Sequence, residues 1–417
     1  MSGIRVNEWL HNSGTGGIWQ TSAGNVGIAS SVPTAKLVVT GDANISGVTT
    51  ANQFSGAAFI PSAGQLSHRN IIINGAMQVA QRAASATAQA NGFHTVDRIE
   101  IGSSNLENAA DQAQVAVASG NDAYSAGFRK SFKLTNGANS ADVDDQLKVS
   151  YWIEAQDLAC SGWDDSSSSS NITLSFWVKS SVAQTFPCVL YHSDSSKGYS
   201  FNYSATTSWT RITHTIPGAA GQAINNDNGQ GILIQWVQYM GTNYTTSDHT
   251  LETWHSYDSA DRCRDVTTTW INTDDATFEI TGVQLEVGSV ATPFEHRKFQ
   301  DELRDCMRYY QQWGASGQDG NFCVGASHLT SGVDQTRNAS MLPTMLRAAP
   351  TITEFGNGLK VFGSGSEVAV TNIQDINVTN GSNMLCWTCE HSDIGDNNEI
   401  VVVCNTDNGG AYLDAEL

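Results

Sequence analysis

Short apolar runs separated by turn residues fill the chain from about residue 65 to residue 297. The runs are rich in β-branched and aromatic residues and are bounded by Gly, Ser, Asn and Asp, which is the pattern of strands. The clearest candidates are residues 148–153, 172–178, 199–203, 209–216 and 232–238. Because helix-length periodicity is missing here, the pattern predicts an antiparallel β-sandwich over 65–297.

The last strand of this block changes phase in its middle. Phe278 and Ile280 lie on one face of an extended chain, whereas Val283 and Leu285 continue on the other. Gly282 stands at the change. A β-bulge at this glycine would return all four apolar side chains to one buried face.

A helical period follows the block. The apolar positions are Phe299, Leu303, Cys306, Tyr310 and Trp313, and Gly314 follows as a C-terminal stop. The spacing predicts one amphipathic helix within a connecting segment at 298–314. Two heptads are fewer than the three or four that indicate a coiled coil, so packing against the sandwich is favoured over a three-helix stub on a trimer axis.

Beyond Pro343 and Pro350 the pattern returns to that of strands. The candidates are residues 351–354, 360–362, 368–373, 384–387 and 400–403. Together they predict a second, smaller β domain over 315–417. The expected fold class is therefore mainly β, with a sandwich, one connecting helix and a small C-terminal β domain.

Residues 1–64 carry few large apolar side chains. These are Trp9, Leu10, Trp19, Phe54 and Phe59. Leu37 and Val39 alternate with their neighbours as in a short strand, between glycine-containing turns. Strands this thin bury apolar surface only by association with identical copies, so we expect a homo-oligomer. A flexible Gly/Ser linker is the alternative.

Composition narrows the classes of partner. The 417-residue chain has a formal net charge of -20, from 41 acidic and 21 basic residues, so its surface repels a nucleic-acid backbone. It holds no apolar run near the roughly 18 residues that cross a bilayer, and the start MSGIRVNEWLHN lacks the features of a signal peptide. We therefore expect no nucleic acid, no membrane insertion and no export by the usual route.

Eight cysteines are too few for a disulfide scaffold and indicate assembly in a reducing compartment. Cys386 and Cys389 form one C-x-x-C pair. A zinc site needs two further ligands from distant residues, and neighbouring strand positions point to opposite faces. Ordinary core cysteines are favoured over zinc.

Three segments resemble the repeating parts of bacteriophage tail-fibre proteins whose middle is a jelly roll of the carbohydrate-binding type. They read NIIINGAMQVAQR at 70–82, GVQLEVGSVATPFEHR at 282–297 and DELRDCMRYYQQW at 301–313. The resemblance covers 70–350 and implies a jelly roll at 65–297 whose first and last strands are neighbours. It also implies assembly in the bacterial host cytoplasm into the virion tail.

GNVGIASSVPTAKLVVTGDANISGV at 24–48 resembles the shaft and attachment regions of phage fibres. That resemblance implies a homotrimer whose N-terminus, residues 1–64, binds other virion tail proteins. Candidate attachment residues are Val6, Trp9, Leu10 and Trp19.

The sequence predicts no enzyme and no catalytic residues. Ordinary catalytic signatures are absent. The acidic pairs are Asp144 with Asp145, Asp164 with Asp165, and Asp274 with Asp275. Adjacent strand residues face opposite sides, whereas glycoside hydrolysis needs two carboxyl groups across one cleft. A polysaccharide depolymerase remains the lesser alternative, because residues distant in sequence could converge.

Sugar-binding candidates are aromatic residues in polar loops, because a pyranose stacks on an exposed ring. They are Trp163, Tyr244, Trp254, Tyr257 and Trp387, with Phe322 and His391 as further contacts. Trp152, Trp177, Trp209 and Trp236 lie within strands and are expected in the core. The alternative for the loop aromatics is that they pin loops or fill subunit contacts.

No cofactor or metal is required by the sequence, although calcium could bind at Asp142, Asp144 and Asp145 or at the loop 225–229. Turn chemistry explains these residues equally well. The expected function is attachment of a phage particle to host-surface polysaccharide through a trimeric fibre. A purely structural virion component, such as a head fibre, connector or decoration protein, is the main alternative.

Overall fold

The computed structural model describes residues 8–10, 17–40, 68–245, 249–314, 322–329, 335–356, 358–363, 366–378, 383–392, 400–405 and 409–417. It is mainly β, as predicted. The chain divides into two compact units, Met1–Phe59 and Ile60–Leu417. None of the described helices is long and apolar enough to cross a bilayer.

The first unit holds one four-stranded sheet. Its strands are β1 (Glu8–Leu10), β2 (Gly17–Gln20), β3 (Val26–Ile28) and β4 (Leu37–Val39). β3 and β4 run parallel, and the other neighbours run antiparallel. The strand predicted around Leu37 and Val39 is confirmed, and residues 17–40 are not a structureless linker.

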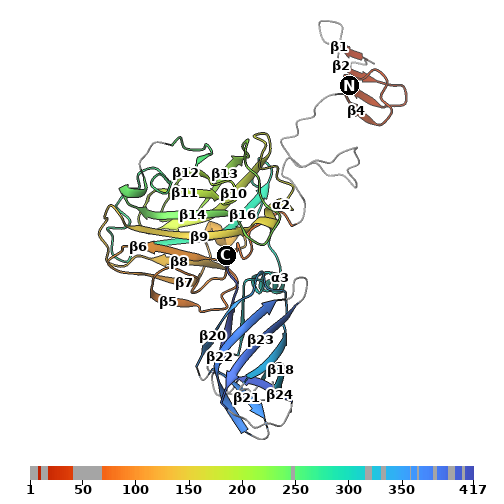
Figure 1. Ribbon diagram of the computed structural model, residues 1–417. Coiled ribbons are helices and arrows are strands. Elements are labelled where there is room, and N and C mark those ends of the chain that lie inside the picture. The colour runs from red at the N-terminus through yellow and green to blue at the C-terminus, as the bar shows by residue number, and fades with distance from the viewer. Residues whose placement is uncertain are drawn as a thin grey trace. The chain divides into compact units, whose positions relative to one another are not determined.

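The second unit contains the predicted β-sandwich, whose two six-stranded sheets lie face to face (Figure 1). The β10 sheet has the order β13 (Thr210–Pro217), β10 (Asn171–Ser180), β16 (Thr277–Val287), β8 (Lys130–Thr135), β7 (Ala110–Ala116) and β5 (Ser85–Gln89). The β14 sheet has the order β15 (His255–Ser256), β12 (Lys197–Ala205), β11 (Gln184–His192), β14 (Gln230–Met240), β9 (Gln146–Glu154) and β6 (Glu100–Ser104). Successive strands β8 to β11 alternate between the sheets, which is a jelly-roll connection. All five predicted strands of this block are confirmed.

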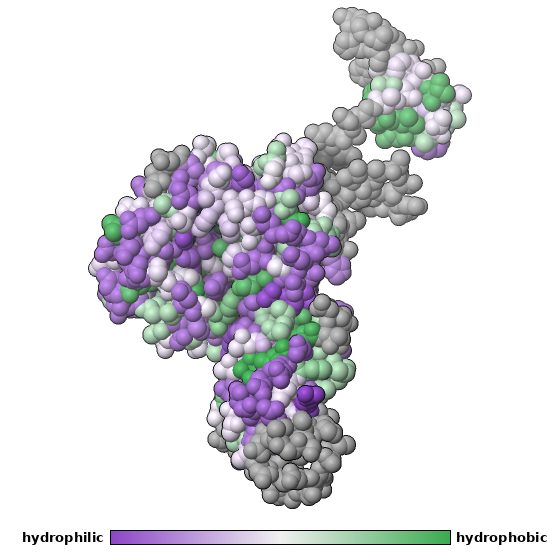
Figure 2. Space-filling view, in the orientation of Figure 1, coloured by the Kyte–Doolittle hydropathy of each residue, from purple (hydrophilic) through white to green (hydrophobic). Residues whose placement is uncertain are grey.

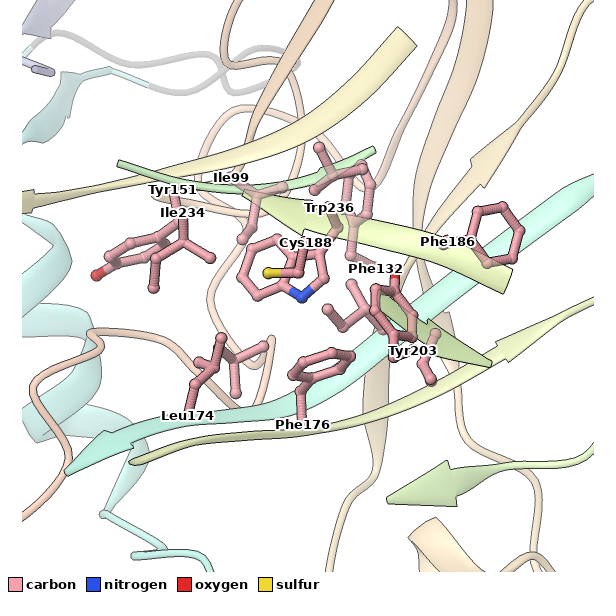
Figure 3. Packing of buried hydrophobic residues seen from close by; sticks show 14 of the residues in the cluster. Ile99, Phe132, Tyr151, Leu174, Phe176, Phe186, Cys188, Tyr203, Ile234 and Trp236 are labelled. Atoms are coloured by element: carbon pink, nitrogen blue, oxygen red, sulfur yellow. The ribbon is translucent and has the colours of Figure 1, made fainter. Parts of the chain in front are cut away.

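Large aromatic and aliphatic side chains from both sheets fill the space between them (Figure 3). Phe176 of β10 meets Trp236 of β14 edge to face, with ring centroids 5.7 Å apart and planes at 80°. The same ring meets Tyr203 at 5.1 Å and 86°. Edge-to-face contacts of this kind are the favoured geometry for aromatic pairs and fix how the sheets stack.

The predicted β-bulge lies at Gly282. Ser175 pairs with Gln284 and Trp177 pairs with Thr281, so two residues of β16 stand opposite one of β10. Gly282 has a φ of +62°, and a Cβ atom placed there would lie 2.4 Å from Cζ of Phe128. Glycine therefore serves both the left-handed backbone and the close approach of the buried ring.

The predicted contact between the NIIING and QLEVGS segments is also confirmed. The Ile71 N–H donates to the Leu285 carbonyl at 2.9 Å, and the Val283 N–H donates to the Gly75 carbonyl at 2.9 Å. The Asn70 amide bridges the same strand, because its Oδ1 accepts from Leu285 N at 3.1 Å and its Nδ2 donates to Val283 O at 3.1 Å. The start of the sandwich is thus tied to its last strand.

The predicted helix is shorter than the sequence indicated. α3 spans Phe299–Cys306, and Tyr310–Trp313 form strand β17 instead. β17 pairs with β25 (Gly410–Asp414), a partner about a hundred residues away that a local period does not reveal. The prediction of a helix through Trp313 is therefore wrong beyond Cys306. Two further short helices, α1 (Asp122–Ser125) and α2 (Ala155–Ala159), and the 3₁₀ turn η1 (Thr242–Tyr244) were not predicted.

The C-terminal region forms a three-stranded sheet and a closed barrel. The sheet is β17, β25 and β20 (Thr351–Phe355), in that order. The barrel has the order β18 (Phe322–Leu329), β19 (Gln335–Met341), β23 (Met384–His391), β22 (Ser366–Val378), β21 (Leu359–Gly363) and β24 (Ile400–Asn405). All five strands predicted in this region are confirmed, whereas β18, β19 and β25 were not foreseen.

Two arginines of the sandwich hold the C-terminal segment. Arg98 is 1% exposed, pairs with the Glu416 carboxylate and lies 3.5 Å from the ring centre of Tyr309. Arg82 approaches Glu416 at 3.4 Å and Asp414 at 3.0 Å. Because a buried guanidinium is tolerated only when it is paired, these contacts fix the segment after β25 to the sandwich.

The close fit at Gly282 gives a stability prediction. Gly282→Ala should lower the free energy of unfolding by roughly 1–2 kcal/mol for the left-handed backbone and by roughly 1–3 kcal/mol more for the clash with Phe128. Gly120→Ala is the matched control, because its φ is +90° and nothing lies within 4 Å of the added Cβ. Denaturant unfolding of both variants checks this. Equal losses would mean that the Phe128 contact is unimportant.

Candidate functional site

Alternation along the β14 sheet sends one set of side chains outward, away from the sandwich core. Leu233 of β14 pairs with Trp152 of β9 and with Tyr191 of β11. The residues next to them, Ile234 and Tyr151, are buried in the core. Since neighbours along a strand face opposite sides, Trp152 and Tyr191 face outward.

Three aromatic rings gather on this outer face. Trp152 and Tyr191 meet edge to face, with centroids 6.4 Å apart at 80°, and Tyr191 and Tyr257 lie 4.4 Å apart at 52°. All three are half-buried, so part of each ring remains in contact with solvent. The Tyr257 N–H donates to the Ser196 carbonyl at 2.9 Å, which holds the loop after β15 over the sheet. We call Trp152, Tyr191 and Tyr257 the aromatic platform.

Polar side chains continue the same face of the sheet. Ser150 and Lys148 precede Trp152 at steps of two residues, about 7 Å each, and share its side of β9. Gln235 Nε2 lies 3.3 Å from Ser150 Oγ. Lys148 Nζ and Arg262 Nη1 both donate to Gln146 Oε1, at 2.8 and 3.0 Å. Burial and the neighbouring Arg262 lower the pKa of Lys148 to about 8, partly offset by Glu100.

Ser150 and Gln235 are only 2% and 7% exposed, so the polar groups beside the rings that a ligand can reach are those of the half-buried Lys148 and Arg262. Ring faces next to ammonium and guanidinium donors suit a polyhydroxylated ligand. The C–H face of a pyranose stacks on an aromatic ring, while its hydroxyl groups exchange hydrogen bonds with polar side chains. On the view in Figure 2, hydrophilic residues cover much of the surface of the sandwich.

Of the five predicted sugar-binding aromatics, only Tyr257 belongs to the platform. Trp163 and Trp387 are buried, and Trp387 Nε1 donates to Ser340 Oγ at 3.0 Å. Trp254 Nε1 donates to the Pro217 carbonyl at 2.6 Å, and its ring lies 5.2 Å from Tyr199. These three side chains have structural partners because they fill the core or anchor a loop.

Tyr244 also differs from the expectation. Its half-buried ring packs against the cluster of Val189 and Val237, and the Arg262 guanidinium lies 5.2 Å from the ring centre. Tyr244 therefore supports the loop after β14 and holds Arg262. It contributes to the site through that arginine.

Trp152, Trp177, Trp209 and Trp236 were all expected in the core. Trp236 is in the main core, and Trp209 is buried in the separate Phe128 cluster. Trp177 is only half-buried against that cluster, and Trp152 is half-buried and faces outward. The signal was present, since Val149, Tyr151 and Ile153 all lie inward and leave the even-numbered positions outside. The continuous apolar run Tyr151–Trp152–Ile153 concealed that parity.

Ser200, His249 and Asp261 form a chain of polar contacts over β12. Ser200 Oγ lies 2.7 Å from His249 Nε2, and His249 Nδ1 lies 2.9 Å from Asp261 Oδ1. These are the distances of a nucleophile, a base and an orienting carboxylate. Ser200, however, is 0% exposed, so a substrate carbonyl does not reach its hydroxyl in this structure. These contacts among Ser200, His249 and Asp261 fix the loop between β14 and β16 onto the sheet.

The acidic candidates serve turns and local pairs. Asp145 Oδ2 accepts from Asp142 N at 3.0 Å, Asp227 Oδ1 accepts from Gly229 N at 2.8 Å, and Asp165 Oδ2 lies 3.1 Å from His192 Nε2. In the part of the chain that the structure describes, no group of three or more His, Cys, Asp or Glu side chains is placed to hold a metal ion. Calcium binding stays a prediction.

Cys389 of the C-x-x-C pair is buried in the barrel core, and its Sγ lies 2.9 Å from Thr336 Oγ1.

The residues predicted to attach the chain to the virion are described only in part. Val6 lies outside the described residues, and Trp9 and Leu10 are described only as part of the backbone of β1. Trp19 is half-buried in β2.

The face of the N-terminal sheet opposite Trp19 carries a row of apolar side chains. Ile18, Ile28 and Val39 are cross-strand partners on neighbouring strands, and they are 45%, 40% and 36% exposed. Leu37, on the same face of β4 as Val39, is also exposed. We call these four residues the apolar row.

No family model and no curated protein matches the sequence. Solved structures give weak likenesses. An arabinose-bound MgGH51 α-L-arabinofuranosidase matches at 12% identity and a TM-score of 0.28, over 53% of this chain and 26% of the other. The enzymatically active domain of tailspike protein 4 of bacteriophage CBA120 matches at 10% identity and 0.27, over 52% and 21%.

A third likeness is to a family 11 carbohydrate-binding module of the cellulosomal cellulase Lic26A-Cel5E of Clostridium thermocellum. It matches at 10% identity and a TM-score of 0.25, over 50% of this chain and 95% of the module. The chain thus spans about a quarter or less of the first two proteins. At these scores the likenesses establish neither a family nor a function.

The contacts among Ser200, His249 and Asp261 give a second prediction. Ser200→Ala removes the partner of His249 Nε2, and loss of one such bond should lower the local opening free energy by about 1–2 kcal/mol. Hydrogen exchange of the peptide 249–261 should then quicken about tenfold. Ser204→Ala, at an exposed position of the same strand, is the control and should leave the exchange unchanged. Unchanged exchange in both variants would show that the contacts among Ser200, His249 and Asp261 do not hold the loop.

Proposed function

We propose that this chain is a non-enzymatic, trimeric phage virion fibre that attaches the particle to host-surface glycans through the aromatic platform. The observation that supports this most is the outward position of Trp152, Tyr191 and Tyr257 on a sheet whose next positions are polar. Partly exposed rings beside the half-buried Lys148 and Arg262 favour sugar binding over a purely scaffolding sheet. The resemblance of 70–350 to phage fibres supplies the virion setting.

Weak single contacts are sufficient for this role. A few stacking interactions give one shallow site only a modest affinity. Three copies held on one fibre raise the apparent affinity by orders of magnitude through effective concentration. Such binding is reversible at each site and suits a particle that searches a surface before it commits. The net charge of -20 means that the platform must supply specific contacts to an anionic envelope.

The apolar row supports association of copies through the first unit. Ile18, Ile28, Leu37 and Val39 expose apolar surface on one face of a small sheet, and burial of that face gains free energy in proportion to its area. Identical copies packed about one axis would cover it. The remaining N-terminal residues would then bind other tail proteins.

The glycan role gives a binding prediction at Tyr191. Tyr191→Ala and Trp152→Ala should each weaken binding of the full chain to host-envelope polysaccharide by about tenfold per site, because a stacking surface is lost. Tyr191→Phe keeps the ring and should bind nearly as the wild type does. Surface plasmon resonance on immobilised polysaccharide measures this.

Each result of that measurement has a distinct meaning. Equal binding by all the variants would place the sugar site elsewhere. No binding by the wild type to any host polysaccharide would favour a structural virion component. Release of oligosaccharides during the incubation would overturn the non-enzymatic assignment.

The oligomer gives a separate prediction. Sedimentation equilibrium of the wild type should give three times the chain mass of 44.6 kDa. Ile28→Asp places a charge within the apolar row and should shift the protein toward single chains. Val32→Asp is the control, because Val32 is 76% exposed and lies outside the strands. A folded wild-type monomer at working concentrations would contradict the trimer.

A further inference from the structure

A second site lies at the edge of the sandwich, where residues 68–73, the end of α2 and helix α3 meet. A cavity of about 470 Å³ opens there. Its charged lining is Arg69, Arg297, Arg304 and Arg308, with Asp157 and Asp305. All three segments that resemble phage fibres contribute to this wall. Arg297 serves the closure of the sandwich, because its Nη2 donates to the Asn70 carbonyl at 2.8 Å and its Nη1 to Asp305 Oδ2 at 3.1 Å.

The charge of this wall contrasts with that of the chain. Four of the 21 basic residues line one cavity in a molecule with a net charge of -20. Buried carboxylates behind the wall orient two of them. Arg308 Nη2 donates to Glu154 Oε1 at 2.6 Å, and Arg69 Nε lies 4.0 Å from Glu286 Oε2. Glu154 and Glu286 are both 0% exposed and do not line the cavity, but they occupy donors of the wall: Arg308 gives both its Nε and its Nη2 to Glu154.

Two of the arginines keep donor groups for a ligand. Arg69 Nη2 donates to the Pro293 carbonyl at 3.1 Å and its buried Nε lies toward Glu286, so its Nη1 is left without a hydrogen-bond partner among the described residues. Arg304 makes one long contact, 3.8 Å to Asp301 Oδ1, and its side chain is 60% exposed. Hydrogen bonds from a guanidinium to an oxyanion are charge-assisted and are among the stronger ones in proteins.

We propose that this cavity binds an oxyanion, a carboxylate or a phosphate, carried on a molecule of about the size of one or two sugar units. The planar fork of a guanidinium matches both oxyanions in a bidentate manner. The volume lies in the range of small-molecule sites, roughly 300–1,000 Å³. Ile71, Ile73 and Val287 provide apolar wall for a carbon skeleton. This site is separate from the aromatic platform and does not depend on it.

Isothermal titration of the full chain at low salt tests the proposal. The probes are glucuronate, glucose 6-phosphate and inorganic phosphate, with glucose as the neutral control. At least one sugar anion should bind saturably, glucose should not, and 0.5 M NaCl should weaken the binding. Arg304→Gln and Arg69→Gln should each lower the affinity about tenfold or more, the usual effect of losing one charged hydrogen bond. Arg304 is exposed, so its variant keeps the fold.

Two control variants make the test specific. Arg129→Gln changes an arginine outside the cavity, which contacts Tyr124, and should bind as the wild type does. Tyr191→Ala alters only the platform and should also leave the affinity unchanged. A failure of the glycan proposal is thereby distinguished from a failure of this one.

Several results would overturn the inference. The first is the absence of saturable binding by all three anions. The second is wild-type affinity in both Arg304→Gln and Arg69→Gln. If inorganic phosphate binds as tightly as both sugar anions, the sugar ring adds nothing to the affinity. The proposal that the oxyanion is carried on a sugar-sized molecule would then be wrong. Tighter binding of glucuronate than of glucose 6-phosphate would assign a carboxylate, and the reverse a phosphate.

Discussion

The alternation of side chains along β9, β11 and β14 is the constraint on which the rest of the molecule depends. Inward positions such as Tyr151, Leu190 and Trp236 meet the β10 sheet and exclude water. The same geometry obliges their neighbours to face outward. A single pattern therefore builds the core and displays Trp152 and Tyr191. A one-residue slip of any of these strands would exchange core and surface, so the core holds the platform in register.

The first and last segments of the sandwich are bound to each other. Residues 70–75 bind along β16, and the bulge at Gly282 lets that strand pass Phe128 while its apolar side chains stay inside. At the other end of the chain, Glu416 pairs with Arg98 and Arg82. The cavity lined by arginines lies beside the contact between residues 70–75 and β16. The segments that close the sandwich therefore also form the proposed anion site.

Features that depend on local patterning could be predicted from the sequence. Strands such as 172–178 and 232–238, and the bulge at Gly282, follow from apolar alternation and a single glycine. The contact between residues 70–75 and β16 came from the resemblance to phage fibres. Features that depend on distant partners could not be predicted. Tyr310 and Trp313 continue a helical period but pair with β25, because the partner strand satisfies their backbone groups. The surroundings of the loop aromatics could not be predicted either, because exposure depends on tertiary contacts: Trp163 and Trp387 are buried, and Trp254 packs against Tyr199.

The most direct test of the account is a crystal structure of the full chain with an oligosaccharide from the host envelope. The account predicts a sugar ring stacked on Trp152, Tyr191 or Tyr257. A sugar bound only at the barrel or at the opposite sheet of the sandwich would contradict it.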